Sequence, residues 1–436
     1  MVLLKNFKNI FLIPELVKKL LFTLGVLIVY RLGVVIPVIG INIPLLAEHM
    51  KRLGSAGGLL SYLDLFSGGA LQQCTLFALG IGPYITASIM MQMLSMTMPY
   101  FEQLAKEGEY GRKIINQYTR YLALVLSIGY SLGYVTYLEH ANLILTPGLP
   151  FKALFVLSLT TGALFVMWLG EQISLMGLGN GSSLIIFAGI VSRFPEYVIR
   201  TIHWVQIGNM HVVVALLILV IFMAITGCIV FLEKGDRKIP VQYARRIIGQ
   251  RVYGGQSTYI PFKINTAGIM PVIFASSVLN IPLFISTMLS QYDFFRVAAE
   301  WLKVGGVFYN ILEFVLIVFF TYFYTAMIFN PVELADQMKK SGGFVPGIRP
   351  GKQTADFFDY ILNRIGLVGA LYLGTLALLP NILGSLIAMP FVLGGTSLLI
   401  VVGVALETSS QIESYLIEHK YEGFLVTGRM KSRATR

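Results

Sequence analysis

The sequence Gly80-Ile81-Gly82-Pro83-Tyr84-Ile85-Thr86-Ala87-Ser88 occurs a second time, in modified form, as Gly268-Ile269-Met270-Pro271-Val272-Ile273-Phe274-Ala275-Ser276. The shared frame is G-I-x-P-x-I-x-A-S, and the copies lie 268 − 80 = 188 residues apart, which is too far for a short structural repeat. Both copies sit inside long apolar runs. Two related halves would explain the pattern, because Gly and Pro interrupt membrane helices at corresponding places in repeat-built transport proteins. The alternative is chance similarity, since these residue types are common in membrane spans.

The composition is that of a membrane protein. Of 436 residues, 56% are hydrophobic and 13% are charged, whereas a soluble domain has about 25% charged residues. We therefore predict an all-α, polytopic membrane protein. Neither Cys74 nor Cys228 has a partner at ligand-like spacing, so we expect no disulfide framework and no metal site. We also expect the first apolar span to be retained, because no small-residue cleavage site follows it.

Ten apolar segments are predicted to cross the membrane, since about 20 residues span a hydrocarbon core of ~30 Å. They are residues 17–36, 72–98, 121–138, 154–169, 182–198, 212–231, 267–289, 311–329, 365–386 and 396–412. An odd number of spans in each half requires the second half to enter from the opposite side. We therefore predict two inverted five-helix halves, residues 17–205 and 206–415, with an amphipathic N-terminus (1–16) and a basic tail (416–436).

Between the first two spans lies an apolar piece that is too short to cross the membrane. It is flanked by glycines and contains Leu59, Leu60, Leu63, Leu65 and Phe66. A solvated loop has no reason to present these side chains to water. The favoured interpretation of residues 54–66 is a re-entrant piece lodged inside the protein, where irregular backbone is tolerated at membrane depth. A soluble loop is the alternative.

Basic residues collect on one side of this topology, in the N-terminus, the tail and the loops after spans 2, 6 and 8. The positive-inside rule then places both termini in the cytoplasm. Two basic loops, residues 233–266 and 330–364, exceed what topology requires. The first has strand-like pieces at 251–253 and 258–260, and the second has prolines that restrict its backbone. Ordered basic loops suit an anionic partner surface, although charges that only set topology are the alternative.

Few ionisable residues lie at membrane depth, where a charge costs about 2.5 to 3.5 kcal/mol on insertion scales. We expect Arg31, Glu171 and Glu313 to lie near span ends, which leaves Glu407 as the acid well inside a span. The sequence shows no nucleophile with a base and no metal-ligand spacing, so we expect neither an enzyme nor a cofactor. A pore with apolar walls remains, in which isoleucines at mid-depth exclude water and ions by dewetting. Ordinary helix packing is the alternative for any one isoleucine.

Seven stretches together resemble the SecY-type family of protein-conducting channels, in its bacterial form, over essentially the whole chain. Besides the two motif copies, they are residues 64–71 (DLFSGGAL), 177–181 (GLGNG), 252–258 (VYGGQST), 344–351 (FVPGIRPG) and 394–402 (GGTSLLIVV). The resemblance implies two five-helix halves around an hourglass pore, with a lateral gate between spans 2 and 3 of one half and spans 7 and 8 of the other. It also implies a passive channel of the bacterial inner membrane, which passes unfolded, presequence-bearing polypeptides and releases apolar segments into lipid.

The resemblance further implies which residues act, by their place in the matching motifs. The pore ring would be Ile81, Ile85, Ile186, Ile273 and Ile400; the plug would be residues 54–66; and the contacts with a motor or ribosome would be Arg245, Arg246, Arg251 and Arg349. The gate-lining spans carry Thr86, Ser88, Gln92, Ser276, Ser277 and Asn280, whose polar groups we expect to meet across the closed gate. One departure is Gln250, where family members commonly carry arginine.

The implied partners are the small membrane subunits SecE and SecG, the motor ATPase SecA, the ribosome, signal sequences with their nascent polypeptides, and anionic lipids. No cofactor is implied. The main alternative is a secondary transporter with inverted repeats that is driven by an ion gradient, and its substrate would need no presequence, motor or ribosome.

Overall fold

The computed structural model describes residues 13–42, 44–46, 67–243, 246–248, 251–253, 257–288, 293–302, 306–387 and 394–427. The chain divides into two compact units, Met1–Phe194 with Val404–Arg436 and Pro195–Gly403. The predicted halves, 17–205 and 206–415, end 11 and 12 residues further along the chain. The predicted plug, with Leu59, Leu60, Leu63, Leu65 and Phe66, lies outside the described residues.

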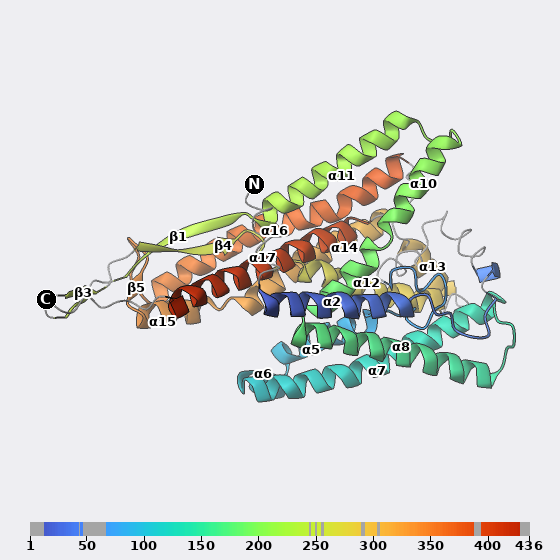
Figure 1. Ribbon diagram of the computed structural model, residues 1–436, viewed down its shortest axis with the longest axis horizontal. Coiled ribbons are helices and arrows are strands. Elements are labelled where there is room, and N and C mark those ends of the chain that lie inside the picture. The colour runs from blue at the N-terminus through green and yellow to red at the C-terminus, as the bar shows by residue number, and fades with distance from the viewer. Residues whose placement is uncertain are drawn as a thin grey trace. The chain divides into compact units, whose positions relative to one another are not determined.

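The first unit is built from helices that pack on one another (Figure 1). Its helices are α2 (Pro14–Gly33), α5 (Gly82–Thr97), α6 (Pro99–Lys106), α7 (Glu109–His140), α8 (Leu149–Met176), α9 (Gly181–Val191) and the part of α17 (Gly395–Thr427) from Val404 on. Helix α7 packs against both α5 and α8, and α8 packs against α2 and α9. Prolines lie in the first turn of α2, α5, α6 and α8, where a missing N–H leaves no helical hydrogen bond unmade.

The segment before α5 is not helical, so the predicted span 72–98 is wrong at its start. Residues 67–81 form turns whose backbone is bonded to the rest of the unit. The N–H of Val38 donates to the Cys74 carbonyl (3.0 Å) and that of Leu76 to the Ile36 carbonyl (2.9 Å), and Tyr134 Oη donates to the Leu71 carbonyl (2.8 Å). These bonds satisfy polar backbone away from water, which is what permits irregular structure at this depth.

The second unit holds the remaining helices and the sheet. Its helices are α10 (Phe194–Gln206), which begins at the boundary, α11 (Val212–Glu233), α12 (Met270–Met288), α13 (Asp293–Trp301), α14 (Val307–Ile328), α15 (Pro331–Lys340), α16 (Lys352–Ile387) and the start of α17. Helix α14 packs between α12 and α16, and α15 packs on α16. The predicted span 182–198 is divided between α9 and α10.

Both long basic loops contribute to one ordered sheet. Strands β1 (Asp236–Tyr243), β4 (Ser257–Lys263) and β5 (Gly343–Phe344) are antiparallel in the order β4-β1-β5, and β2 (Arg246–Ile248) pairs with β3 (Arg251–Tyr253). The strands predicted at 251–253 and 258–260 are confirmed, whereas β1 was not predicted. Ile239 and Val241 alternate inward from β1 onto Phe262, Met338 and Phe358, as a sheet with one buried face requires.

Seven helical stretches in the described ranges are long and apolar enough to cross a membrane. They are Glu109–His140, Leu149–Met176, Gly181–Gln206, Val212–Glu233, Val307–Lys340, Lys352–Gly384 and Gly395–Glu418. Helices α2, α5 and α12 occupy the other three predicted spans, 17–36, 72–98 and 267–289.

Glu313 lies near the start of its span, as expected, but its side chain does not reach water. Helix α14 begins at Val307 rather than at the predicted 311, which places Glu313 in its second turn, fully buried. Asn381 Nδ2 donates to Glu313 Oε2 at 3.5 Å. The other carboxylate oxygen has no hydrogen-bond partner within the described ranges. An acid in a membrane span usually reaches water or a polar partner. Here the packing of neighbouring helices buries Glu313, and hydropathy alone does not predict that packing.

Candidate functional site

The two motif copies adopt the same backbone. Gly80 has a φ of 54° and Gly268 a φ of 62°, both in the left-handed region that glycine adopts without a steric penalty. Two residues after each glycine a helix begins, α5 in the first unit and α12 in the second. Pro83 and Pro271 therefore lie in a first turn and not, as expected, in a helix interior. The repeat marks where two helices start.

The first turns of the two helices close in the same way. The Ile85 N–H donates to the Ile81 carbonyl at 3.1 Å, and the Ile273 N–H donates to the Ile269 carbonyl at 3.2 Å. Ile269 is therefore the structural counterpart of Ile81, and it was missing from the predicted pore ring. Chance similarity does not explain copies that agree in dihedral angle, helix start and first hydrogen bond.

Each unit seats the first isoleucine of its motif against a glycine. In the first unit a Cβ added to Gly170 of α8 would lie 3.2 Å from Ile81 Cδ1. In the second, a Cβ added to Gly403 of α17 would lie 2.5 Å from Ile269 Cγ1. Both isoleucines are buried. Their positions are thus set by close packing on a neighbouring helix.

A second repeat, not predicted from the sequence, begins α9 and α17. It reads GSSLII over residues 181–186 and GTSLLI over 395–400, and the copies are 395 − 181 = 214 residues apart. A Cβ on Gly181 would overlap the Gly170 carbonyl oxygen of α8, and one on Gly395 would overlap the Ala377 carbonyl oxygen of α16. Each helix thus starts in backbone contact with the helix before it. The two copies consist of residue types that are common in membrane spans, so the sequence alone gives only a weak indication of this repeat.

The structure places four predicted ring residues in buried positions. Ile81 and Ile186 are buried in the first unit, Ile273 and Ile400 are buried in the second, and Ile85 is half-buried. Ile186 and Ile400 hold the same sixth place in the second repeat. The two repeats together therefore supply the ring residues of both units from equivalent helix starts.

The predicted gate residues fall into two groups. Thr86 Oγ1 donates to the Gly82 carbonyl (3.1 Å) and Ser276 Oγ to the Ile273 carbonyl (3.0 Å), so their hydroxyls are satisfied by their own helices. Ser88 and Ser277 are half-buried.

The two amides of the gate set differ from its hydroxyls. Gln92 Oε1 and Asn280 Oδ1 are buried acceptors with no partner among the described residues, although Gln92 Nε2 donates to Ser88 Oγ at 3.3 Å. A buried acceptor without a donor costs about 1 to 3 kcal/mol. Gln92 and Asn280 therefore retain hydrogen-bonding capacity for a further group.

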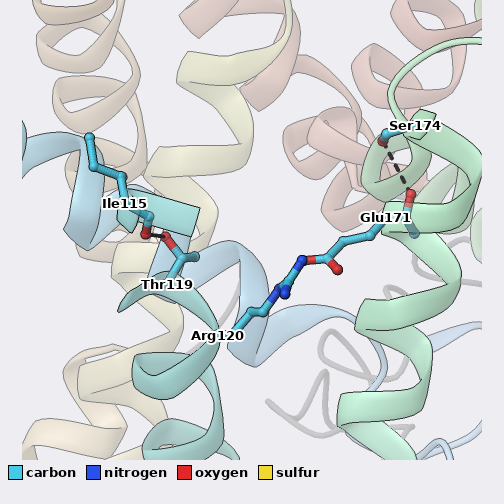
Figure 2. Close-up of polar contacts among 6 residues, drawn as sticks. Ile115, Thr119, Arg120, Glu171 and Ser174 are labelled. Atoms are coloured by element: carbon cyan, nitrogen blue, oxygen red, sulfur yellow. Dashed lines mark hydrogen bonds and ion pairs between the residues drawn. The ribbon is translucent and has the colours of Figure 1, made fainter. Parts of the chain in front are cut away.

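Separate polar contacts join α8 to α7 and to the start of α9. Figure 2 shows Arg120 of α7 reaching Glu171 of α8, where Arg120 Nε donates to Glu171 Oε1 at 2.8 Å. Ser174 Oγ donates to the Gly170 carbonyl (3.1 Å) and accepts from the Gly181 N–H (2.9 Å). The start of α9, and with it the second repeat, is thus bonded to α8.

The structure describes part of the set of arginines predicted to contact a motor or ribosome. Arg349 is exposed, and its carbonyl accepts from Thr354 Oγ1 at 2.9 Å, which holds the turn after β5. Arg246 and Arg251 lie on the hairpin β2–β3, where Ile248 pairs with Arg251. Arg245 and the side chains of Arg246 and Arg251 lie outside what the structure describes. Among the described residues, no three His, Cys, Asp or Glu side chains cluster as metal ligands would.

A family model described as SecY matches residues 75–409. The chain belongs to the SecY family. Among SecY-family relatives, the protein translocase subunit SecY of Aquifex aeolicus (strain VF5) is 44% identical over 427 residues, which cover 96% of this chain and 98% of the relative. The protein of the same description from Escherichia coli (strain K12) is 44% identical over 424 residues, covering 96% and 95%.

Solved structures agree in fold with this SecY-family chain. One described as "The structure of a protein conducting channel" matches with a TM-score of 0.66 and 19% identity, covering 95% of this chain and 94% of that one. Sec61 in the canine ribosome–channel complex from the endoplasmic reticulum matches with a TM-score of 0.62 and 18% identity, covering 95% and 94%. The predicted all-α SecY-type fold is confirmed. The secondary-transporter alternative is not favoured by these relatives.

Proposed function

We propose that this chain is the pore-forming subunit of a Sec translocon. It is a passive channel that passes unfolded, presequence-bearing polypeptides across the membrane and releases apolar segments laterally into lipid. The observation that carries the proposal is the pair of repeated helix starts, which bring buried isoleucines to equivalent places in both units. The chain acts as a channel rather than an enzyme. Its sequence has no nucleotide-binding P-loop, so a partner motor or the ribosome supplies the energy.

Ile81, Ile85, Ile186, Ile273 and Ile400 form the proposed constriction, and Ile269 joins them as the counterpart of Ile81. A ring of aliphatic side chains excludes water and ions by dewetting when it is closed. It also presents no hydrogen-bonding group to which a passing polypeptide would adhere. The plug proposed for residues 54–66, with Leu59, Leu60, Leu63, Leu65 and Phe66, adds a second apolar seal.

The lateral gate is proposed to involve α5 and α12. Gln92 and Asn280 each hold a buried amide oxygen without a partner in the described ranges, which supports a role for them in polar contacts across the gate. The same two helices carry the hydroxyl residues of the predicted gate, Ser88, Ser277, Thr86 and Ser276. Of these, Thr86 and Ser276 already donate to carbonyls of their own helices. Interhelical hydrogen bonds in membranes contribute roughly 0.6 kcal/mol each. Each Leu, Ile, Phe or Val residue of a signal sequence gains about 0.3 to 0.6 kcal/mol on entering lipid. A core of about ten such residues therefore gains several kcal/mol, which is enough to open such a gate.

The basic loops are the proposed docking face for SecA and the ribosome, through Arg245, Arg246, Arg251 and Arg349. The exposed Arg349 on a turn whose backbone is held by a hydrogen bond supports this, since the planar guanidinium can bind a carboxylate through two parallel hydrogen bonds. The same distribution of charge supports both termini being cytoplasmic, in a bacterial inner membrane that contains anionic lipids. SecE and SecG are the proposed membrane partners.

The decisive experiment places a photo-crosslinking residue at Ile85 or Ile273 in membrane vesicles and stalls a presequence-bearing protein midway. Leu216 on α11, an exposed side chain on a membrane-length helix, is the matched control. Adducts at Ile85 and Ile273 but not at Leu216 are expected. Intact translocation without adducts at either isoleucine would mean that the motif only packs helices and that the pore lies elsewhere.

A further inference from the structure

The short helix α13 is strongly two-sided. Phe294, Val297 and Trp301 follow the i, i+3, i+7 spacing of one helix face. Their side chains are 77%, 49% and 64% exposed. Beside this stripe runs a charged one with Arg296, ion-paired to Asp293 at 3.0 Å, and Glu300, while the remaining side of the helix is half-buried. Large apolar side chains thus stand uncovered next to a charged stripe on the exposed part of the helix.

Helix α13 is too short to cross a membrane. Its nine residues rise about 13 Å at 1.5 Å per residue, less than half of the hydrocarbon thickness of ~30 Å. A short helix with a large apolar face and a charged face can instead lie in the plane of the membrane–water interface. Trp and Phe favour that depth, because their rings tolerate the boundary between water and acyl chains.

The apolar face of α13 continues into the exposed apolar surface of a membrane-length helix. The rings of Trp301 and Phe308 meet edge to face at a centroid distance of 5.9 Å. Phe308 belongs to the first turn of the membrane-length helix α14, where Val307 and Ile311 are also exposed. The face of α13 therefore joins the lipid-facing side of α14 at the level where that helix enters the membrane.

We propose that α13 is an interfacial anchor, in which Phe294, Val297 and Trp301 insert among the lipid acyl chains beside the start of α14 while Asp293, Arg296 and Glu300 face water. The ligand is the lipid surface itself. With two acids and one base, α13 has no net positive charge with which to attract anionic headgroups. Its insertion therefore rests on apolar contact and is independent of the anionic lipid fraction.

The anchor also bears on α12. Helix α13 follows α12 closely in the chain and packs against it. Holding α13 at the membrane surface fixes that end of α12 at a constant depth. This anchoring is independent of the proposed gate, because it follows from the exposed side chains of α13 alone.

The test uses tryptophan fluorescence. The chain has three tryptophans, Trp168, Trp204 and Trp301, so Trp168→Phe with Trp204→Phe leaves Trp301 as the only reporter in the full-length protein. The variant is reconstituted in phosphatidylcholine bilayers whose acyl chains are brominated near the headgroup or near the chain end. Quenching of Trp301 should be at least twofold stronger with the shallow bromines, and iodide on both sides should quench it weakly.

A matched reporter is Trp168, which lies eight residues before the end of the membrane-length helix α8 and is half exposed (49%). With Trp204→Phe and Trp301→Phe, it should be quenched more by the deep bromines. Replacing half of the lipid with phosphatidylglycerol should leave the Trp301 result unchanged.

Phe294→Ser with Val297→Ser, in the Trp301-only protein, should halve quenching by the shallow bromines and raise quenching by iodide, whereas Glu300→Gln should do neither. Circular dichroism confirms that each variant is folded. Strong iodide quenching of Trp301 without bromine quenching would overturn the proposal, because the helix would then face water. Protection of Trp301 from both bromine and iodide would also overturn the proposal. A protein partner or a second copy of the chain would then cover the apolar face of α13.

Discussion

In the first unit, α5 runs for 16 residues and stops before Pro99, whereas its counterpart α12 in the second unit runs for 19 residues and contains Pro282. Ile81 packs beside Gly170 of α8, but Ile269 packs beside Gly403 of α17. The helix starts agree while their surroundings differ. The features that both units retain are a left-handed glycine, a first-turn proline and a buried isoleucine. We infer that these are the functional part of the repeat, and that each unit is stabilised by contacts of its own.

The largest effect is expected where a helix start touches backbone. Gly181→Val and Gly395→Val force α9 away from the Gly170 carbonyl and α17 away from the Ala377 carbonyl. Overpacking of this kind costs about 3 kcal/mol. Thermal unfolding in detergent should show a similar decrease in stability for both variants. Gly384→Ala, where an added Cβ meets nothing within 4 Å, is the control. A decrease in stability for only one of the two variants would show that the two copies of the second repeat are not structurally equivalent.

A smaller, matched effect is expected at the left-handed glycines. Gly80→Ala and Gly268→Ala place a side chain at φ values of 54° and 62°, which costs about 1 to 2 kcal/mol for a residue with a Cβ. Gly82→Ala has an ordinary backbone and open space around its added Cβ, so it should be neutral. Equal shifts in unfolding temperature for the first two variants would sharpen the comparison. A neutral Gly268→Ala would show that only the first copy needs the turn.

The gate amides should have a functional effect rather than a large structural one. Gln92→Leu and Asn280→Leu each remove a group able to form one interhelical hydrogen bond, worth roughly 0.6 kcal/mol. That corresponds to about a threefold rise in export of proteins with weakened signal sequences. Ser276→Ala removes a hydroxyl bonded to its own helix and should change export less. Unchanged export of weak-signal proteins in both Leu variants would exclude these residues from the gate.

The Arg120–Glu171 ion pair should contribute least. Half of the Arg120 side chain is exposed (50%), and exposed pairs are worth about 0.2 to 1 kcal/mol. A double-mutant cycle with Arg120→Gln and Glu171→Gln, measured by unfolding at low and high salt, should give a coupling in this range that shrinks with salt. A coupling above this range would mean that the α7–α8 contact is held mainly by charge.

Long-range features of the fold could be predicted because they follow from hydropathy and charge. The approximate positions of the helical spans and the strand at 251–253 needed no tertiary information. Hydropathy could not predict that α5 starts at Gly82. The turns of residues 67–81 are as apolar as a helix, and they are held by distant partners such as Tyr134. The burial of Glu313 likewise depends on packing against α16, which hydropathy does not describe.

The candidate site was predicted less completely than the fold. Ile85 and Ile273 stand out from the first repeat, whereas the place of Ile269 depends on its packing against Gly403 of α17, which the sequence does not show. The second repeat was missed because a glycine in backbone contact has no sequence signature beyond its small size. Close contacts such as Gly181 against Gly170 are set by helix geometry.

The shortness of α5 affects where its first turn lies. Sixteen residues rise about 24 Å, several ångströms less than the hydrocarbon thickness of ~30 Å. The bonded turns of residues 67–81 therefore complete the depth of this segment. The first N–H groups of α5 then lie below the membrane surface rather than in water, and they have no acceptor within their own helix. The partial positive charge of a helix N-terminus acts most strongly in such a medium of low dielectric constant.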